Sequence, residues 1–219
     1  MVRVGVLVSG RGTNLQALID AEARGELGAR IVVVISNRAG VPALERARRA
    51  GIPAVVLERR AFPSRQAQEE AIVACLRDHQ VDLVVLAGYD RILGPTVLAA
   101  YPLRIINIHP SLLPAFRGTL QAQRAALEYG VKVSGCTVHF VTEEVDGGPI
   151  ILQRVVPVYD DDTPETLAAR ILAEEHRALP EAVRLFAEGR LRVVGRRVVI
   201  LPAPALAGAS GEDRANRST

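Results

Sequence analysis

The sequence predicts a single Rossmann-like α/β domain, with a mostly parallel twisted sheet, flanking helices and antiparallel strands near the C-terminus. Three observations support this prediction. Short apolar runs alternate with helical segments through the first half of the 219 residues, as a series of βαβ units requires. A glycine-rich turn joins the first apolar run to the first helix. Two later β-rich runs follow one another without a helix between them, which favours antiparallel pairing.

The alternation is clearest in the first half of the chain. Residues 2–8 form a nearly continuous apolar run, typical of a strand covered on both faces. Leu15, Leu18 and Ile19 then recur at helical spacing. Right-handed crossovers between the strands of such units predict a parallel sheet. By the same criteria we expect strands at 31–35, 54–57, 83–87 and from 105 to the His109-Pro110 pair, with helices at 41–50, 64–79 and a short one ending near 100.

The pattern changes after Pro114. We expect a helix at 119–129, strands at 134–141 and 150–158 joined by a loop at 142–149, and a strand pair within 193–201. Between them a long helix should run from Pro164, with Thr163 as its cap, to about 188, bent or broken at Pro180. We divide the chain into a catalytic domain at 1–192, a terminal strand pair at 193–202 packed on it, and a disordered tail at 203–219.

Composition narrows the functional classes. The chain is 49% hydrophobic, enough for a sizeable core, and no apolar run is long enough to span a membrane, so we expect a cytoplasmic protein. A net charge of +3 with dispersed basic residues does not favour nucleic-acid binding. Lys132 is the only lysine, which leaves little room for phosphate-loop or Schiff-base lysine chemistry. Cys75 and Cys136 are isolated and predict reduced thiols.

The segment from Ile105 to Pro114 is the strongest candidate for a site. Asn107 and His109 are two residues apart, so they leave the same face of a strand, at the carboxyl end where open α/β sheets bind ligands. A His-Pro pair can also be a simple turn. A second polar cluster, which contains Asp146 before two glycines, favours the site, although Asp-Gly-Gly by itself is also a common turn.

The turn after the first strand is a candidate phosphate site. Gly10 and Gly12 let the backbone approach an anion, and the following helix directs its first amides and its dipole there, with Thr13 or Asn14 as both cap and ligand. A purely steric βα turn is the plain alternative. A dinucleotide fingerprint is another, but Leu15 stands where its third glycine belongs, and residues 36–38 would have to suit a phosphorylated ribose. A monophosphate fits better than NAD.

Four segments together resemble one family. Gly-Arg-Gly-Thr-Asn-Leu, Gly-Tyr-Asp-Arg-Ile-Leu, Asn-Ile-His-Pro-Ser-Leu-Leu-Pro and His-Phe-Val-Thr-Glu-Glu-Val-Asp-Gly-Gly-Pro-Ile occur in the order and spacing of the glycinamide ribonucleotide formyltransferases, which are folate-dependent. The resemblance covers 2–192. It implies transfer of a formyl group from 10-formyltetrahydrofolate, a co-substrate, to the amine of 5'-phosphoribosylglycinamide, giving formylglycinamide ribonucleotide and tetrahydrofolate in the purine pathway that leads to IMP.

The resemblance also assigns residues to roles. We expect no metal, small-molecule partners only, no nucleic acid or membrane, and a monomer or homodimer. Two departures concern the fit of the ligands: Asp90 stands where the family often has an apolar or basic residue, and 117–120 differs from the usual Pro-Gly and is one residue longer. The implied roles are catalysis for Asn107, His109 and Asp146, phosphate binding for Gly12, Thr13 and Asn14, ribose binding for Glu175, and folate binding for Arg65, Asp90, Arg91, Ile92, Leu93 and Asn107.

The chemistry also follows from the residue types. Asn107 can donate to the negative charge that develops on the formyl oxygen, an interaction whose loss typically costs about 3 kcal/mol in the barrier. His109 as imidazolium can stabilise the same charge and donate a proton, and an Asp146 carboxylate nearby would favour that charged form or relay a proton through water. His139 and His176 are expected to be structural, and no spacing supports a metal site.

Three rival functions are distinguishable. A formyltransferase for methionyl-tRNA or a nucleotide sugar is the nearest, although a tRNA enzyme would require a basic C-terminal domain, and we expect none in the residues after 188. An NADP-dependent oxidoreductase would be built on the first βαβ unit, against which the missing third glycine counts. A non-catalytic nucleotide-binding module would tolerate alanine at Asn107, His109 and Asp146.

Overall fold

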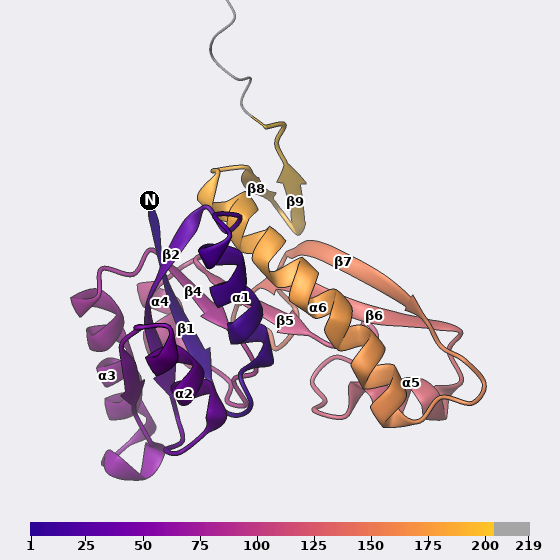
Figure 1. Cartoon of the computed structure of the whole chain (residues 1–219), viewed down its shortest axis with the longest axis horizontal. Helices are drawn as coiled ribbons and strands as arrows, with labels where there is room; N and C mark the ends of the chain where they lie inside the picture. The colour runs from indigo at the N-terminus through magenta and orange to yellow at the C-terminus, as the bar shows by residue number, and fades with distance from the viewer. Residues whose placement is uncertain (204–219) are drawn as a thin grey trace, which may run out of the picture.

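A nine-stranded sheet runs through residues 1–203, the part of the chain that the computed structural model describes (Figure 1). Its strand order is β3-β2-β1-β4-β5-β6-β7-β9-β8. The elements are β1 (Val2–Val8), α1 (Thr13–Ala23), β2 (Ala29–Ser36), α2 (Pro42–Arg49), β3 (Ala54–Val56), a 3₁₀ turn (Arg59–Ala61), α3 (Arg65–Asp78), β4 (Leu83–Leu86), α4 (Pro95–Ala100), β5 (Ile105–His109), α5 (Ala122–Tyr129), β6 (Val133–Phe140), β7 (Ile150–Pro157), α6 (Pro164–Ala187), β8 (Leu191–Val194) and β9 (Arg197–Ile200).

The sheet changes direction half-way. Strands β3, β2, β1, β4 and β5 are parallel, whereas β6 is antiparallel to both β5 and β7. The β8–β9 hairpin joins the sheet through one bridge, between Ile150 and Arg197. The predicted fold class, mostly parallel with antiparallel strands near the C-terminus, is confirmed. The reversal at β5 exposes the carboxyl end of that strand beside β6, which returns along it.

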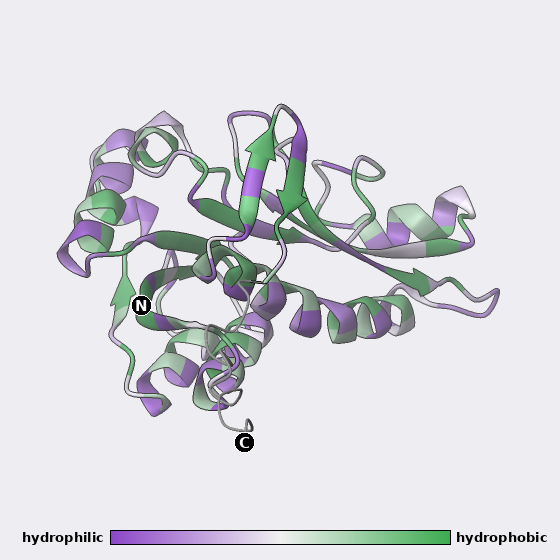
Figure 2. Ribbon diagram, turned by 90° about the horizontal axis from the view of Figure 1, so that it is seen from above, coloured by the Kyte–Doolittle hydropathy of each residue, from purple (hydrophilic) through white to green (hydrophobic). Residues whose placement is uncertain are grey.

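Two hydrophobic cores cover the two faces of the sheet. Alternation along the strands separates them: Val4, Val6 and Val8 of β1 point into the core beneath α1, α2 and α6, whereas Leu7 points into the core beneath α3 and α4. Figure 2 accordingly shows mostly hydrophobic strands between helices that carry polar residues on their outer sides. Because both faces are covered, the strand ends and their loops are the places left for a site.

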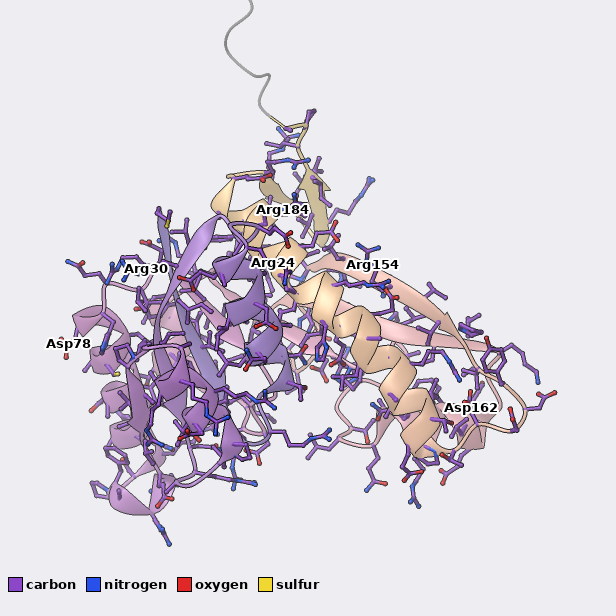
Figure 3. The ribbon with its side chains drawn as sticks, viewed as in Figure 1. Arg24, Arg30, Asp78, Arg154, Asp162 and Arg184 are labelled. Carbon is purple, nitrogen blue, oxygen red and sulfur yellow. The ribbon has the colours of Figure 1, made fainter. Side chains whose placement is uncertain are left out.

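Polar contacts join the long helix α6 to the antiparallel strands and hold its first turns. Arg154, labelled on β7 in Figure 3, pairs with Glu181 of α6. Asp162, just before α6, accepts two hydrogen bonds of 2.8 Å from Arg170 of the same helix. Hydrogen bonds from Arg170 and from the Tyr159 backbone hold the pKa of Asp162 far below its ordinary value. Arg170 also donates to the Pro157 carbonyl of β7 at 2.8 Å, so the first turns of α6 are held against that strand.

Three expectations about elements were wrong. The helix predicted at 119–129 begins at Ala122, because the Thr119 hydroxyl accepts a hydrogen bond from the Gln121 amide and forms a turn instead. The break predicted as one possibility at Pro180 is wrong, since α6 is continuous and Leu179 and Ala182 are fully buried on either side, so that packing outweighs the missing donor. The bend, the other possibility, stays a prediction. The terminal hairpin begins at Leu191, before the predicted residue 193.

The Thr163 cap with Pro164 behind it is confirmed: Thr163 forms a capping box with Thr166. The tail predicted to be disordered lies, apart from residue 203, outside the described residues. Within residues 1–203, no helix is long and apolar enough to cross a membrane.

Candidate active site

The end of β5 carries the polar pair that the alternation predicts. Ile106 and Ile108 are buried in one core, while Asn107 and His109 leave the opposite face of the strand. Across the strand pair, Asn107 stands opposite His139 of β6, and their side chains meet, with 3.2 Å between Asn107 Nδ2 and His139 Nε2. The His109 side chain is only 7% exposed. A buried imidazole of this kind requires hydrogen-bond partners.

Asp146 reaches the same place from the loop between β6 and β7. The Gly147 amide donates to the Glu144 carbonyl at 3.0 Å, which closes a turn with Asp146 at φ +49°. The turn directs the carboxylate inward: Asp146 Oδ2 lies 3.5 Å from His109 Nδ1, and Oδ1 lies 3.7 Å from His139 Nε2. The structure therefore brings Asn107, His109 and Asp146 together, as the sequence predicts.

His139 is buried and neutral. Burial lowers the pKa of His139 below its ordinary value, although its contact with the Phe140 carbonyl and the charge of Asp146 oppose the shift. With Nδ1 donating to the Phe140 carbonyl at 2.9 Å, Nε2 is left as an acceptor for the Asn107 amide. This contact orients the Asn107 side chain, so that its amide nitrogen lies toward His139. The expectation that His139 is structural fits this position beside the candidate catalytic group.

His109 is placed between two acceptors. Its Nε2 lies 3.0 Å from the Phe116 carbonyl oxygen and its Nδ1 faces Asp146. A carbonyl oxygen can only accept, so Nε2 carries the hydrogen of that contact and Nδ1 is the nitrogen that faces the carboxylate. Asp146 is held in turn by the Gly118 amide, which donates to Oδ2 at 2.8 Å. Phe116 and Gly118 were not predicted, since backbone groups leave no side-chain signal in a sequence.

A cavity of about 520 Å³ lies between the glycine turn, the ends of β4 and β5, and the start of α6. Gly12, at φ +73°, is the N-cap of α1, and no side chain caps that helix. The expectation that Thr13 or Asn14 caps α1 was therefore wrong. The physical reason is that the Asn14 side chain points to α6, where its Nδ2 donates to Glu175 Oε2 at 2.9 Å. The first amides of α1 are left for another acceptor.

Glu175 and Asn14 form a buried polar pair at the wall of this cavity. Glu175 is 7% exposed, and burial raises the pKa of its carboxyl above the ordinary value, although the Asn14 hydrogen bond opposes the shift. Asn14 Oδ1 is also buried and has no hydrogen-bond partner among the described residues. This polar pair and the glycine turn line the same cavity, an arrangement suited to a ligand with hydroxyl groups and an anionic group.

A second cavity, of about 500 Å³, is lined by Arg65 and by residues 90–93, which were assigned to folate. Asn107, the other residue assigned to folate, does not line it. Arg65 donates to Glu69 at 2.9 Å and to the Ile92 carbonyl at 2.6 Å, which places it against the loop after β4. Arg91 and Leu93 line the same cavity. Residues 87–88 line the first cavity and residues 89–93 the second, so one loop separates the two.

Asp90 is held by the protein itself. It accepts hydrogen bonds of 2.9 Å from both Ser9 and Asn37 and pairs with Arg38. Burial opposes ionisation, but these hydrogen bonds and the Arg38 charge outweigh it and hold the pKa of Asp90 below its ordinary value. Because Asn37 and Arg38 are engaged here, the residues that would have to receive a phosphorylated ribose in a dinucleotide site already have partners.

No group of three or more histidine, cysteine, aspartate or glutamate side chains within residues 1–203 is placed to hold a metal ion. Glu143 and Glu144 are exposed, and Glu144 pairs with Arg117 at 2.8 Å and so connects the two loops that lie beside His109.

Proteins of known family resemble this chain in sequence and in fold. Residues 2–183 match the family model described as formyl transferase. The chain belongs to the formyl transferase family. Among curated members, the phosphoribosylglycinamide formyltransferase of Escherichia coli (strain K12) is 44% identical over 192 residues, which cover 88% of this chain and 90% of that protein. The resemblance found in the four sequence segments is confirmed.

Other members of the formyl transferase family are longer. The trifunctional purine biosynthetic protein adenosine-3 of Gallus gallus is 48% identical over 192 residues, and the match covers 88% of this chain but 19% of that protein. The chain therefore spans about a fifth of the length of such trifunctional relatives. The rest of the Gallus gallus protein lies outside the region that matches this chain.

Solved structures agree with the family assignment. Glycinamide ribonucleotide transformylase 1 from Symbiobacterium toebii is 60% identical with a TM-score of 0.91, and the match covers 92% of this chain and 95% of that one. A formyltetrahydrofolate deformylase from Pseudomonas syringae pv. tomato is 32% identical with a TM-score of 0.85, over 92% of this chain and 66% of that one. The names of these two proteins describe a transformylase and a deformylase, so proteins similar to this chain differ in the reaction that they are named for.

Proposed function

We propose that this protein transfers a formyl group from 10-formyltetrahydrofolate to the amine of 5'-phosphoribosylglycinamide, in purine biosynthesis. The observation that carries the proposal is the convergence of Asn107, His109 and Asp146 at the end of β5, beside a cavity walled by the glycine turn. A deformylase, in which water accepts the formyl group, would need the three converging side chains but no cavity for a ribonucleotide. The relatives named as phosphoribosylglycinamide formyltransferases add support through their identity over most of the chain.

The first cavity suits the ribonucleotide. Its phosphate would accept hydrogen bonds from the amides of Gly12, Thr13 and Asn14, where the helix dipole also favours negative charge. The ribose hydroxyls are donors and would meet the two buried acceptors, the Glu175 carboxylate and Asn14 Oδ1. Pro110, next to His109, lines the same cavity, so the glycinamide amine of a ligand bound in this way would point toward the reactive cluster.

The second cavity suits the folate. Arg65 and Arg91 offer positive charge to its carboxylates, while Ile92 and Leu93 offer apolar surface to its rings. The loop at 87–93 lies between the cavities and would bring the formyl group of the folate to the amine of the ribonucleotide. Asp90 contributes through its contacts with Ser9 and Asn37, which hold the shape of this loop.

In the reaction, the amine nitrogen bonds to the formyl carbon and the bond between that carbon and folate N10 breaks. Negative charge on the formyl oxygen is stabilised by the Asn107 amide and by the His109 imidazolium. The attacking amine loses a proton, which Asp146 accepts directly or through water. His109 donates a proton to N10 as it leaves, and the proton on Asp146 then returns to His109, so both groups end as they began. The two acceptors around His109 keep the ring oriented through this exchange. The ligands are small molecules, and the cytoplasmic location and the monomer or homodimer stay predictions.

The test is release of tetrahydrofolate from 10-formyltetrahydrofolate, followed by absorbance, with glycinamide ribonucleotide present or omitted. Release that requires the ribonucleotide is the expected result. Release without it would instead assign the deformylase reaction of the Pseudomonas relative. As a check on the site, Asn14→Ala should raise the KM for the ribonucleotide more than the KM for the folate, and equal changes would contradict the assignment of the glycine turn.

A further inference from the structure

Helix α2 backs the glycine turn on the side away from the first cavity. The two helices α1 and α2 lie on the same face of the sheet (Figure 1). The Ala43 amide donates to the Gly10 carbonyl at 3.1 Å, and Arg46 Nε donates to the Arg11 carbonyl at 2.9 Å. Gly12 packs on the same helix, since a Cβ at Gly12 would lie 2.7 Å from the Ala43 Cα. All three residues of the turn thus contact α2.

These contacts with α2 fix the direction in which the backbone amides of the glycine turn point. In a trans peptide the C=O and N–H bonds point in opposite directions. The Gly10 and Arg11 carbonyls point to α2, so the amides of the same two peptides, those of Arg11 and Gly12, point away from it. The first cavity lies on that side, because its lining includes the turn but no residue of α2. Within residues 1–203 neither amide donates to a backbone carbonyl.

We propose that Arg46 is a positioning residue for the phosphate-binding turn, and the inference rests on the proposed function. Its guanidinium joins three elements: it extends from α2, donates to the Arg11 carbonyl, and donates through Nη1 to Gln16 Oε1 of α1 at 3.2 Å. It does not line the first cavity and lies outside it, next to α1 and α2. Arg46 therefore acts on the phosphate through the backbone and not by touching it.

The alternative is that Arg46 contributes only charge. An exposed cation near the turn would attract any phosphate, and salt would screen that attraction. Two substitutions separate the explanations. Arg46→Lys keeps the charge but loses the planar guanidinium that holds both acceptors at once, whereas Arg46→Met loses both properties. Arg49→Met is the matched control, because Arg49 lies one turn further on in the same helix and, in the described part of the chain, pairs with Glu45 alone, at 3.0 Å.

The experiment measures the Kd of ribose 5-phosphate by calorimetry without folate, together with kcat and both KM values. We expect Arg46→Met to weaken ribose 5-phosphate binding and raise the ribonucleotide KM about tenfold, as for a lost hydrogen bond from a charged group, with folate KM and kcat nearly unchanged. Arg46→Lys should lose most of the same affinity and Arg49→Met should resemble the wild type.

Three outcomes would overturn the inference. Equal weakening by Arg46→Met and Arg49→Met, or full affinity in Arg46→Lys, would show that charge alone acts. A parallel fall in kcat and rise in both KM values would show a general structural defect. Wild-type protein that binds ribose 5-phosphate in an Arg46-dependent way but transfers no formyl group would reject the proposed reaction and keep this inference.

Discussion

Replacing Glu175 by glutamine should make the protein more stable at neutral and alkaline pH while weakening the binding of the ribonucleotide. Glu175 is 7% exposed, and within residues 1–203 its carboxylate accepts one hydrogen bond, from Asn14 Nδ2, and forms no ion pair. Burial therefore raises the pKa of its carboxyl, and its negative charge is unfavourable in the folded state. Glutamine has nearly the same shape and carries no charge.

The expected gain in the free energy of unfolding on Glu175→Gln has two parts. Removal of the buried charge yields about 1.4 kcal/mol for each unit by which folding raises the pKa. In addition, the new amide group can donate to Asn14 Oδ1, a buried acceptor without a partner, and a neutral hydrogen bond contributes about 1 kcal/mol. We expect a total of about 1–3 kcal/mol at pH 8, which raises the Tm by about 2–4 °C for each kcal/mol in a protein of this size.

The direction in which stability changes with pH follows from proton linkage. A carboxyl with a raised pKa in the folded state stabilises the protein when protonated, below its unfolded pKa of 4.5, and that contribution is lost as pH rises through the folded pKa. Relative to Glu175→Gln, the wild type should therefore lose stability from about pH 4.5 upward, until the carboxyl is fully ionised.

Urea unfolding of both proteins between pH 4 and pH 9 measures this difference. The matched control is Glu174→Gln, on the same helix turn, where the carboxylate is paired with Arg177. A difference between wild type and Glu175→Gln that does not grow with pH would refute the reasoning. The same variant should bind the ribonucleotide more weakly, since an amide oxygen accepts less strongly than a carboxylate.

Further predictions concern the turn that carries Asp146. Asp146→Asn should lower kcat by about 10²-fold or more without unfolding the protein, and undiminished turnover would exclude a role in proton transfer. Arg196 donates to the carbonyl next to Asp146 at 2.9 Å, so Arg196→Met should lower kcat severalfold, while Arg192→Met on the same hairpin should not. Gly148→Ala would place a Cβ 1.8 Å from a β6 carbonyl oxygen and should reduce stability in urea by about 3 kcal/mol, whereas Gly10→Ala, with open space around it, should stay within about 0.5 kcal/mol.

Local patterns in the sequence determined the order of the elements and the chemistry at strand ends. Alternation along β5 is enough to put Asn107 and His109 on one face, because side chains in a strand change sides at every residue. The parallel half of the sheet follows from apolar runs separated by helices. The glycine turn, the Thr163 cap and Pro164 are likewise determined by residues within a few positions of one another.

Contacts between distant segments could be decided only by the tertiary structure. Asn14 bonds Glu175 across 161 residues instead of capping its own helix, and Asp146 meets His109 only because β6 returns along β5. Helix α6 continues through Pro180 because its neighbours are buried. Local helix or strand propensity contributes about 1 kcal/mol per residue. Packing and buried hydrogen bonds together contribute more, so the fold decides which side chains meet at the candidate site.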